Sequence, residues 1–163
     1  MSHIQDTSKP HYRPAERDDI GHVARLMRPE DRDEIFHAAQ VSPFVALYNG
    51  MAYSDEVYTI VGSEGQPVAM FGVGKGHFGG GVPWLLGTPD LDGLAMPFLR
   101  QNKAVLKKWL DHYQYLENYV WEKNVVHIKW LKWLGFEFEA ALPMGKSGER
   151  FHRFFMGSRT CAT

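Results

Sequence analysis

The chain has 163 residues, of which 44% are hydrophobic and 23% are charged, and its formal net charge is −1. This balance excludes a disordered or collagen-like protein and predicts one soluble domain with a single core. The near-neutral charge argues against a surface that neutralises many phosphates, so we expect no nucleic-acid partner. The chain has no run of about 18 apolar residues and begins with a polar segment. We therefore expect neither a membrane span nor a secretory signal, and a cytoplasmic location.

The first half of the chain predicts helices followed by strands. Apolar residues recur at intervals of three and four after Asp18 and Asp19, which predicts a helix capped by one of these carboxylates and ended by Pro29. Two apolar runs separated by residues 62–65, a glycine-containing turn, predict a β-hairpin. The expected elements are a flexible arm at residues 1–10, a strand at 11–15, helices at about 18–27 and from about 30, a segment at 43–48 that either extends the second helix or forms a third, and strands at 57–61, 66–73 and 82–87.

The second half predicts helices that alternate with strands. Residues 96–113 carry apolar side chains at helical spacing and present Arg100 and Lys103 on the polar face. Asn124 can cap a later helix, and Gly135 is a typical C-terminal stop. The expected elements are helices at 96–113 and 125–134 and strands at 115–121, 136–140 and 150–156.

This order predicts an α+β domain over residues 11–157, followed by a short tail at 158–163. Hairpins in the middle indicate antiparallel pairing, and the later strand–helix–strand alternation adds parallel pairing. We expect one mixed sheet of about six or seven strands flanked by about four helices. None of the eight histidines pairs with a carboxylate or thiol at metal-ligand spacing, so no metal site is expected.

The segment around Asn124 carries a family resemblance. A strand that ends at an asparagine, one amphipathic helix and Leu134-Gly135-Phe136 resemble the closing half of the GNAT N-acetyltransferase superfamily. Residues 12–20 and 65–73 match the opening elements of that superfamily in order. The block from Asn118 to Phe136 resembles still more closely a podophage family known as internal virion protein A or GNAT-like phage proteins.

The resemblance implies that acetyl-coenzyme A is the co-substrate. In that superfamily two neighbouring strands splay apart and the pantetheine arm lies in the gap, with the diphosphate at the start of the following helix. Here the splayed strands would be residues 82–87 and 116–121. The resemblance thereby implies cofactor contacts from three residues of the first strand, from the asparagine before the last helix and from two residues of the long helix: Trp84, Leu85, Leu86, Asn124, Arg100 and Lys103.

Two family features are missing. The glycine-rich diphosphate loop is replaced by residues 88–97, where Asp90 and Asp92 add negative charge. Arg100 and Lys103 can compensate one turn further along the helix. The position of the family's proton-donating tyrosine is Leu131, which has no proton to give.

His127 is the candidate substitute for the missing tyrosine. It lies one helical turn before Leu131 and three residues after Asn124, on the same helix face. Histidine exchanges protons near neutral pH and can act as acid or base. The alternative is a structural histidine packed beside Trp130. His77 and Glu122 are further candidate bases, and each has a solvent-exposed structural alternative.

Two functions remain open at this level. One is a phage N-acetyltransferase that moves an acetyl group from acetyl-coenzyme A to an amine of a small molecule or a host protein. The other is a GNAT fold without catalysis that serves virion assembly or binds a host protein, which the two missing features favour. A homodimer is an open alternative for either.

Overall fold

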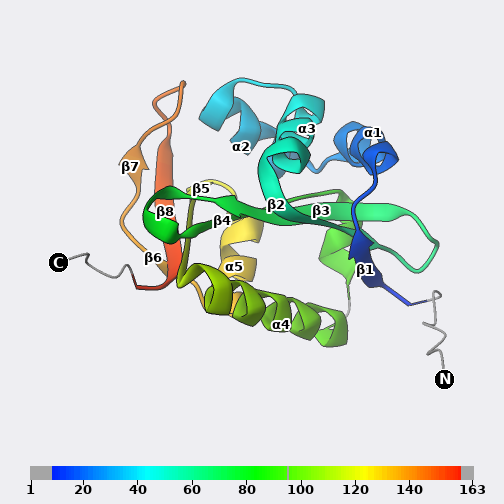
Figure 1. Cartoon of the computed structure of the whole chain (residues 1–163). Coiled ribbons are helices and arrows are strands. Elements are labelled where there is room, and N and C mark those ends of the chain that lie inside the picture. Colours follow the sequence, from blue (N-terminus) through cyan, green and yellow to red (C-terminus); the bar gives the residue numbers. More distant parts are fainter. Residues whose placement is uncertain (1–8, 95, 159–163) are drawn as a thin grey trace.

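The structure is a computed structural model that describes residues 9–94 and 96–158 (Figure 1). Of the predicted arm at 1–10 and tail at 158–163, residues 1–8 and 159–163 lie outside the described residues. Within the described chain there are eight strands: β1 (His11–Pro14), β2 (Ser54–Val61), β3 (Pro67–Lys75), β4 (Gly81–Gly87), β5 (Tyr115–Trp121), β6 (Glu137–Phe138), β7 (Leu142–Pro143) and β8 (Arg150–Gly157). The helices are α1 (Arg17–Leu26), α2 (Pro29–Ala39), α3 (Pro43–Tyr53), α4 (Met96–Tyr113) and α5 (Val125–Leu134), with the 3₁₀ turns η1 (His77–Gly79) and η2 (Pro89–Gly93).

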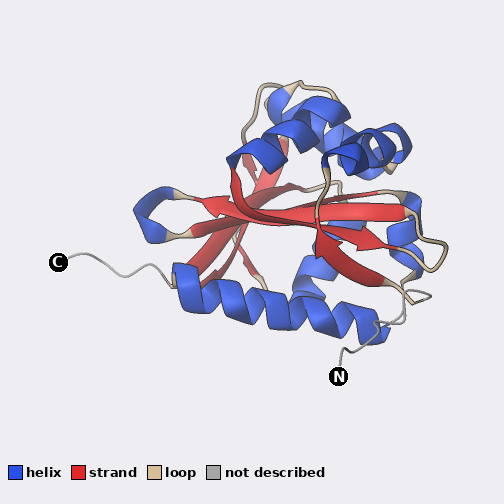
Figure 2. Ribbon diagram, turned by 45° about the vertical axis from the view of Figure 1, so that its right-hand side comes forward, coloured by secondary structure: helices blue, strands red, loops and turns tan. Residues whose placement is uncertain are grey.

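All eight strands belong to one mixed sheet. Its order is β1-β2-β3-β4-β5-β8-β6, and β7 pairs with β8. Helices α1, α2 and α3 cover one face, while α4 and α5 cover the other (Figures 1 and 2). The predicted α+β architecture is confirmed.

Local contacts decide between the two alternatives for the segment at 43–48 and shorten one expected strand. The segment belongs to a separate helix over residues 43–53, because Gln40 ends α2 in the left-handed conformation and the Ser42 hydroxyl accepts the Val45 N–H at 3.2 Å. The predicted strand at 136–140 is shorter, because only Glu137 and Phe138 pair with β8 there. The next short strand, β7, also pairs with β8.

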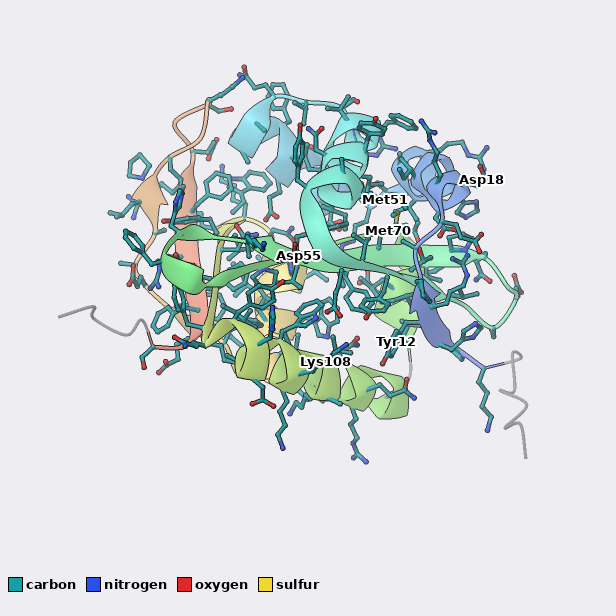
Figure 3. The ribbon with its side chains drawn as sticks, viewed as in Figure 1. Tyr12, Asp18, Met51, Asp55, Met70 and Lys108 are labelled. Carbon is teal, nitrogen blue, oxygen red and sulfur yellow. The ribbon has the colours of Figure 1, made fainter. Side chains whose placement is uncertain are left out.

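The sheet separates two cores. Successive residues of β3 point to opposite faces, so Met70 packs with α1 and α3 while Phe71 packs with α4. Met51 on α3 lies toward Met70 across the first of these layers (Figure 3). The second core includes Leu106 and Trp109 on α4. Each helix layer is thereby anchored to the sheet by its own apolar contacts.

The strand pair at the centre of the sheet diverges. Strands β4 and β5 run parallel and pair only at Gly81–Leu116. The strands on either side, β3 and β8, pair with β4 and β5 along their full lengths. The sheet therefore opens beyond Gly81, between the C-terminal parts of β4 and β5.

A buried carboxylate ties α1 to the sheet. Asp19 is 4% exposed and accepts hydrogen bonds from Arg13 at 2.8 and 2.9 Å, from the Thr59 hydroxyl at 2.7 Å and from the Glu16 N–H at 2.8 Å. Glu16, rather than Asp18 or Asp19, is the N-cap of α1, so the predicted cap position is wrong by two or three residues. Burial raises the pKa of Asp19, but the hydrogen bonds from Arg13, Thr59 and Glu16 outweigh burial and hold that pKa below its ordinary value.

Replacing Asp19 with Asn should lower the free energy of unfolding by about 2–3 kcal/mol at pH 7. Because the pKa is depressed in the folded state, the stabilisation is present above the unfolded-state pKa of about 4 and is lost as pH falls through the folded-state pKa. Urea unfolding between pH 7 and pH 2 measures both effects. Asp18→Asn is the matched control, since Asp18 is an exposed neighbour (Figure 3). Equal stability of Asp19→Asn and wild type at pH 7 would contradict this account.

Candidate active site

The edge of β4 that faces β5 has one backbone N–H without a hydrogen-bond partner among the described residues. Backbone groups of successive strand residues point alternately to the two edges. The Pro83 carbonyl accepts the Asn118 side-chain amide at 2.8 Å, and the Gly87 N–H and carbonyl bond to α2 and its N-cap. By this alternation the Leu85 N–H and carbonyl also point toward β5, where the ladder has ended. Proline has no N–H, so Leu85 holds the unpaired donor of this edge.

On the facing edge of β5, side chains accept the backbone N–H groups of two residues. Asn118 Oδ1 accepts the Tyr119 N–H at 2.8 Å, and Glu34 Oε2 accepts the Trp121 N–H at 3.0 Å. A ligand between the strands therefore finds its free backbone donor on β4.

Two carboxylates of α2 bridge the diverged strand ends. Asp31 is fully buried, and Oδ2 accepts the Gly87 N–H at 2.9 Å while Oδ1 accepts the Asn124 amide at 3.1 Å. The Arg28 Nε also donates to Asp31, at 2.8 Å. Glu34 accepts the Asn124 amide at 3.2 Å besides the Trp121 N–H. Helix α2 thus fixes the end of β4, the end of β5 and the start of α5 in one hydrogen-bonded network.

His127 lies in the first turn of α5, at the opening between the strands. Its N–H donates to the capping Asn124 Oδ1 at 3.3 Å, and the residue is 6% exposed. The Nδ1 atom is buried without a hydrogen-bond partner in the described chain, 3.9 Å from Glu34 Oε1. The ring centroid is 6.4 Å from that of Trp130.

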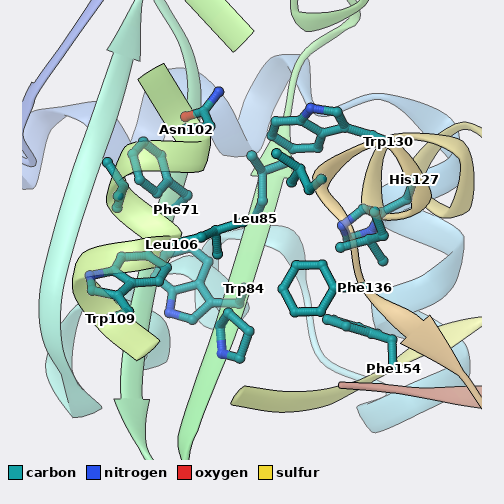
Figure 4. A pocket seen from close by; sticks show the side chains of 14 residues that line it. Phe71, Trp84, Leu85, Asn102, Leu106, Trp109, His127, Trp130, Phe136 and Phe154 are labelled. Atoms are coloured by element: carbon teal, nitrogen blue, oxygen red, sulfur yellow. The ribbon is translucent and has the colours of Figure 1, made fainter. Parts of the chain in front are cut away.

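Two cavities border this opening. The cavity on the α4–α5 face, shown in Figure 4, has a volume of about 50 Å³ and apolar walls. The cavity on the α2–α3 face has a volume of about 160 Å³. Five residues line both cavities: Pro83, Trp84, Leu85, His127 and Phe154. His127 is therefore part of the wall of both cavities, one on each face of the sheet.

The first cavity holds further unpartnered polar atoms. Asn102 Nδ2 and Trp130 Nε1 are buried, and neither has a hydrogen-bond partner among the described residues. Buried donors without partners are uncommon, and a polar ligand is one way to satisfy them. Asn102 was missed by the sequence analysis. Its signal is an asparagine at an apolar position of α4, three residues before Val105.

The predicted site residues divide into two groups. Trp84 and Leu85 border the opening with His127, and Leu86 lines the second cavity. Asn124 is fully buried beneath the opening.

The second group lies elsewhere. Glu122 is in an ion pair with Arg150 at 3.4 Å, and His77 is exposed on η1, at the opposite end of β4 from the opening. Arg100 and Lys103 are exposed on α4, with the Lys103 ammonium 4.2 Å from the centre of the Trp133 ring. None of these four side chains lines either of the two cavities described above.

Arg28 changes the electrostatics of the segment that replaces the glycine-rich loop. Its Nη1 donates to Asp92 at 3.0 Å, so one of the two acidic groups of η2 is already paired. A cavity of about 490 Å³ lies beside this pair and reaches Lys129 on α5. Within residues 9–94 and 96–158, no cluster of three or more His, Cys, Asp or Glu side chains forms a metal-binding group. The helices of the same ranges include none long and apolar enough to cross a bilayer.

Comparisons with solved structures find the same fold. The crystal structure of spermidine N-acetyltransferase from Vibrio cholerae in complex with CoA and spermine matches with a TM-score of 0.63 and 14% identity, covering 92% of this chain and 96% of that one. A GNAT-family acetyltransferase from Bacillus anthracis matches with a TM-score of 0.64 and 12% identity, over 91% and 95% of the two chains. A probable GNAT-family acetyltransferase from Chromobacterium violaceum matches with a TM-score of 0.65 and 19% identity, over 91% and 87%.

Sequence comparisons give a narrower result. A family model described as bacteriophage T7 probable scaffold protein Gp13 matches residues 79–141, less than half of the chain. No curated protein matches the sequence significantly. The likeness that spans the whole chain is therefore structural, and its identities are below 20%. The chain has the fold of the GNAT acetyltransferases.

Proposed function

We propose that this chain is an acyl-coenzyme A-dependent N-acetyltransferase of phage origin that acts in the host cytoplasm. The carrying observation is the pair of cavities that share His127 as a wall residue beside the diverged strands β4 and β5. Such an opening lets a thioester approach from one face of the sheet and an amine from the other. The CoA complex of the structural neighbour from Vibrio cholerae supports the choice of co-substrate.

The donor side would be the cavity under α4 and α5. The free Leu85 N–H can donate to a carbonyl of the pantetheine arm, as can Asn102 Nδ2 and Trp130 Nε1. A volume of about 50 Å³ suits the small acetyl end of the co-substrate. Trp84 and Leu86 would support the strand from the opposite face. Asn124 would act by holding the first turn of α5 in place.

His127 would move the proton that the reaction must relocate. The amine nitrogen forms a C–N bond with the thioester carbon, and the C–S bond breaks. The nitrogen loses one proton to His127, which then gives that proton to the departing sulfur, so that amine plus thioester yield amide plus thiol. Leu131 lines the same cavity and cannot perform this step.

The diphosphate would meet basic side chains rather than a glycine-rich loop. We expect the double substitution of Arg100 and Lys103 by alanine to weaken acetyl-coenzyme A binding by about 1–3 kcal/mol for each charge-assisted bond lost. Calorimetry on the full chain measures the change, with Lys107→Ala on the exposed face of α4 as the control. Unchanged binding in the double variant and weakened binding in Lys129→Ala would instead assign the diphosphate to the cavity beside η2.

Release of free thiol from acetyl-coenzyme A in the presence of a panel of amines tests the proposed activity. We expect amine-dependent thiol release and a matching amount of N-acetylated product. Thiol release without acetylated amine, or no release with any amine, would contradict the proposal.

A second candidate is a GNAT fold that serves virion assembly or binds a host protein. The match of residues 79–141 to a phage scaffold family favours it, because those residues include β4, α4, β5 and α5. Copurification of the chain with phage particles, combined with no binding of acetyl-coenzyme A, would favour this candidate.

A further inference from the structure

We propose that the acceptor is a primary alkylammonium whose nitrogen is held between Glu34 Oε1 and His127 Nδ1. The proposal rests on the proposed acetyltransferase function, because it assigns the α2–α3 cavity to the acceptor. It makes Glu34 the residue that selects a cationic acceptor.

Glu34 presents one oxygen to the cavity while the other is fixed. Its Oε2 accepts the Trp121 N–H at 3.0 Å and the Asn124 amide at 3.2 Å. Its other oxygen, Oε1, lies 3.9 Å from His127 Nδ1. The side chain is 13% exposed, so a carboxylate oxygen at this position has lost most of its contact with water. A buried charge of this kind is stabilised by a charge-assisted partner.

His127 supplies the second contact. Its Nδ1 is buried and has no hydrogen-bond partner in the described chain, although a ring nitrogen is a good donor or acceptor. A separation of 3.9 Å is too long for a direct hydrogen bond, but one atom placed between the two groups can bond to both. An ammonium nitrogen carries three N–H groups, so it can donate to the carboxylate and to a neutral imidazole at the same time.

The walls of the cavity favour a cation on a short apolar chain. Among the described residues that line it, Glu34 is the one with a formal charge. The aromatic rings of Trp84, Tyr119 and Phe154 contribute to the lining and can stabilise a positive charge. The polar atoms of the Asn118 side chain are already bonded to Pro83 and Tyr119. The volume of about 160 Å³ is close to that of a benzene-sized guest.

This arrangement also supplies the first proton transfer. The ammonium loses its extra proton to the Glu34 carboxylate, and Glu34 releases that proton to solvent. The neutral nitrogen can then attack the thioester as described above. An acceptor that carries a carboxylate or phosphate next to the amine would be repelled by Glu34, because the two negative charges would lie a few Å apart in a poorly hydrated site.

Binding of n-butylammonium to the full chain, without acetyl-coenzyme A, tests the site independently of turnover. We expect saturable binding and a shift of the His127 Nδ1 resonance in ¹⁵N NMR, while n-butanol, the neutral analogue, produces neither. Glu34→Gln should weaken n-butylammonium binding about 10- to 100-fold, because the amide keeps an acceptor for Trp121 but removes the charge. Glu30→Gln, which removes the same charge one turn earlier on α2, should bind like wild type.

Equal binding of n-butylammonium and n-butanol by wild type would overturn the proposal, and this comparison needs no variant to fold. Full n-butylammonium affinity in a folded Glu34→Gln variant would overturn it as well. Amine-dependent turnover that is insensitive to Glu34→Gln would refute the ammonium site and leave the acetyltransferase intact. Ammonium binding by a chain that does not bind acetyl-coenzyme A would refute the acetyltransferase and leave the ammonium site intact. Nα-acetyl-lysine methylamide as a second ligand distinguishes a lysine side chain from a free small amine.

Discussion

Replacing His127 with Gln should lower the acetyl-transfer turnover by about 10²-fold or more while the chain still folds. Glutamine retains most of the bulk of histidine and can hydrogen bond, but it cannot take up and return a proton. Because His127 lines both cavities, it is the residue placed to carry a proton from the amine side to the sulfur side. Steady-state kinetics with saturating amine and acetyl-coenzyme A measure the effect as kcat.

A matched control separates catalysis from stability. His112→Gln removes an exposed histidine from α4, away from both cavities, and should leave kcat unchanged. Unchanged turnover with a lowered Tm in His127→Gln would show that the histidine is structural and would refute its proton-transfer role.

The largest expected loss of stability follows from Asp31→Asn, about 3–5 kcal/mol. Asp31 is fully buried and accepts hydrogen bonds from Arg28, Gly87 and Asn124. An amide at this position would turn an N–H group toward donors. Of the ion pairs that the buried Arg28 guanidinium makes with described residues, the one with the half-exposed Asp92 would remain. Removing one member of a buried ion pair is costly because the other charge remains desolvated.

Urea unfolding of the full chain measures this loss. Asp33→Asn removes the same charge from an exposed position on α2 and should change the free energy of unfolding by less than about 0.5 kcal/mol. A loss below about 1 kcal/mol in Asp31→Asn would contradict the role of Asp31 in joining α2 to the strand ends.

The sequence was sufficient for the features that depend on neighbouring residues. Asn124 caps the start of α5 and Gly135 caps its end, as predicted, because helix capping depends on residues within one turn of the helix end. The separate helix α3 is one of the two alternatives that the sequence allows, and Ser42 followed by Pro43 is a typical helix start. The strand predicted at 136–140 is too long, because its end depends on pairing with β8.

The features that depend on contacts between residues far apart in the sequence could not be predicted from the sequence. Asp31 bonds to Gly87, 56 positions away, and to Asn124, 93 positions away. Glu34 bonds to Asn124 across 90 positions. In the sequence these carboxylates are indistinguishable from the solvent-exposed acids beside them in α2. Their role arises only when α2 packs over the open ends of β4 and β5.

The central claim is that acetyl-coenzyme A binds in the opening between β4 and β5. Titration of the ¹⁵N-labelled full chain with acetyl-coenzyme A, followed at the Leu85 amide by NMR, tests this claim most directly. We predict a saturable downfield shift of the Leu85 amide proton, as expected when a free N–H gains an acceptor, and no shift at Gly65 in the distant β2–β3 turn. An unchanged Leu85 resonance at millimolar acetyl-coenzyme A would contradict the claim.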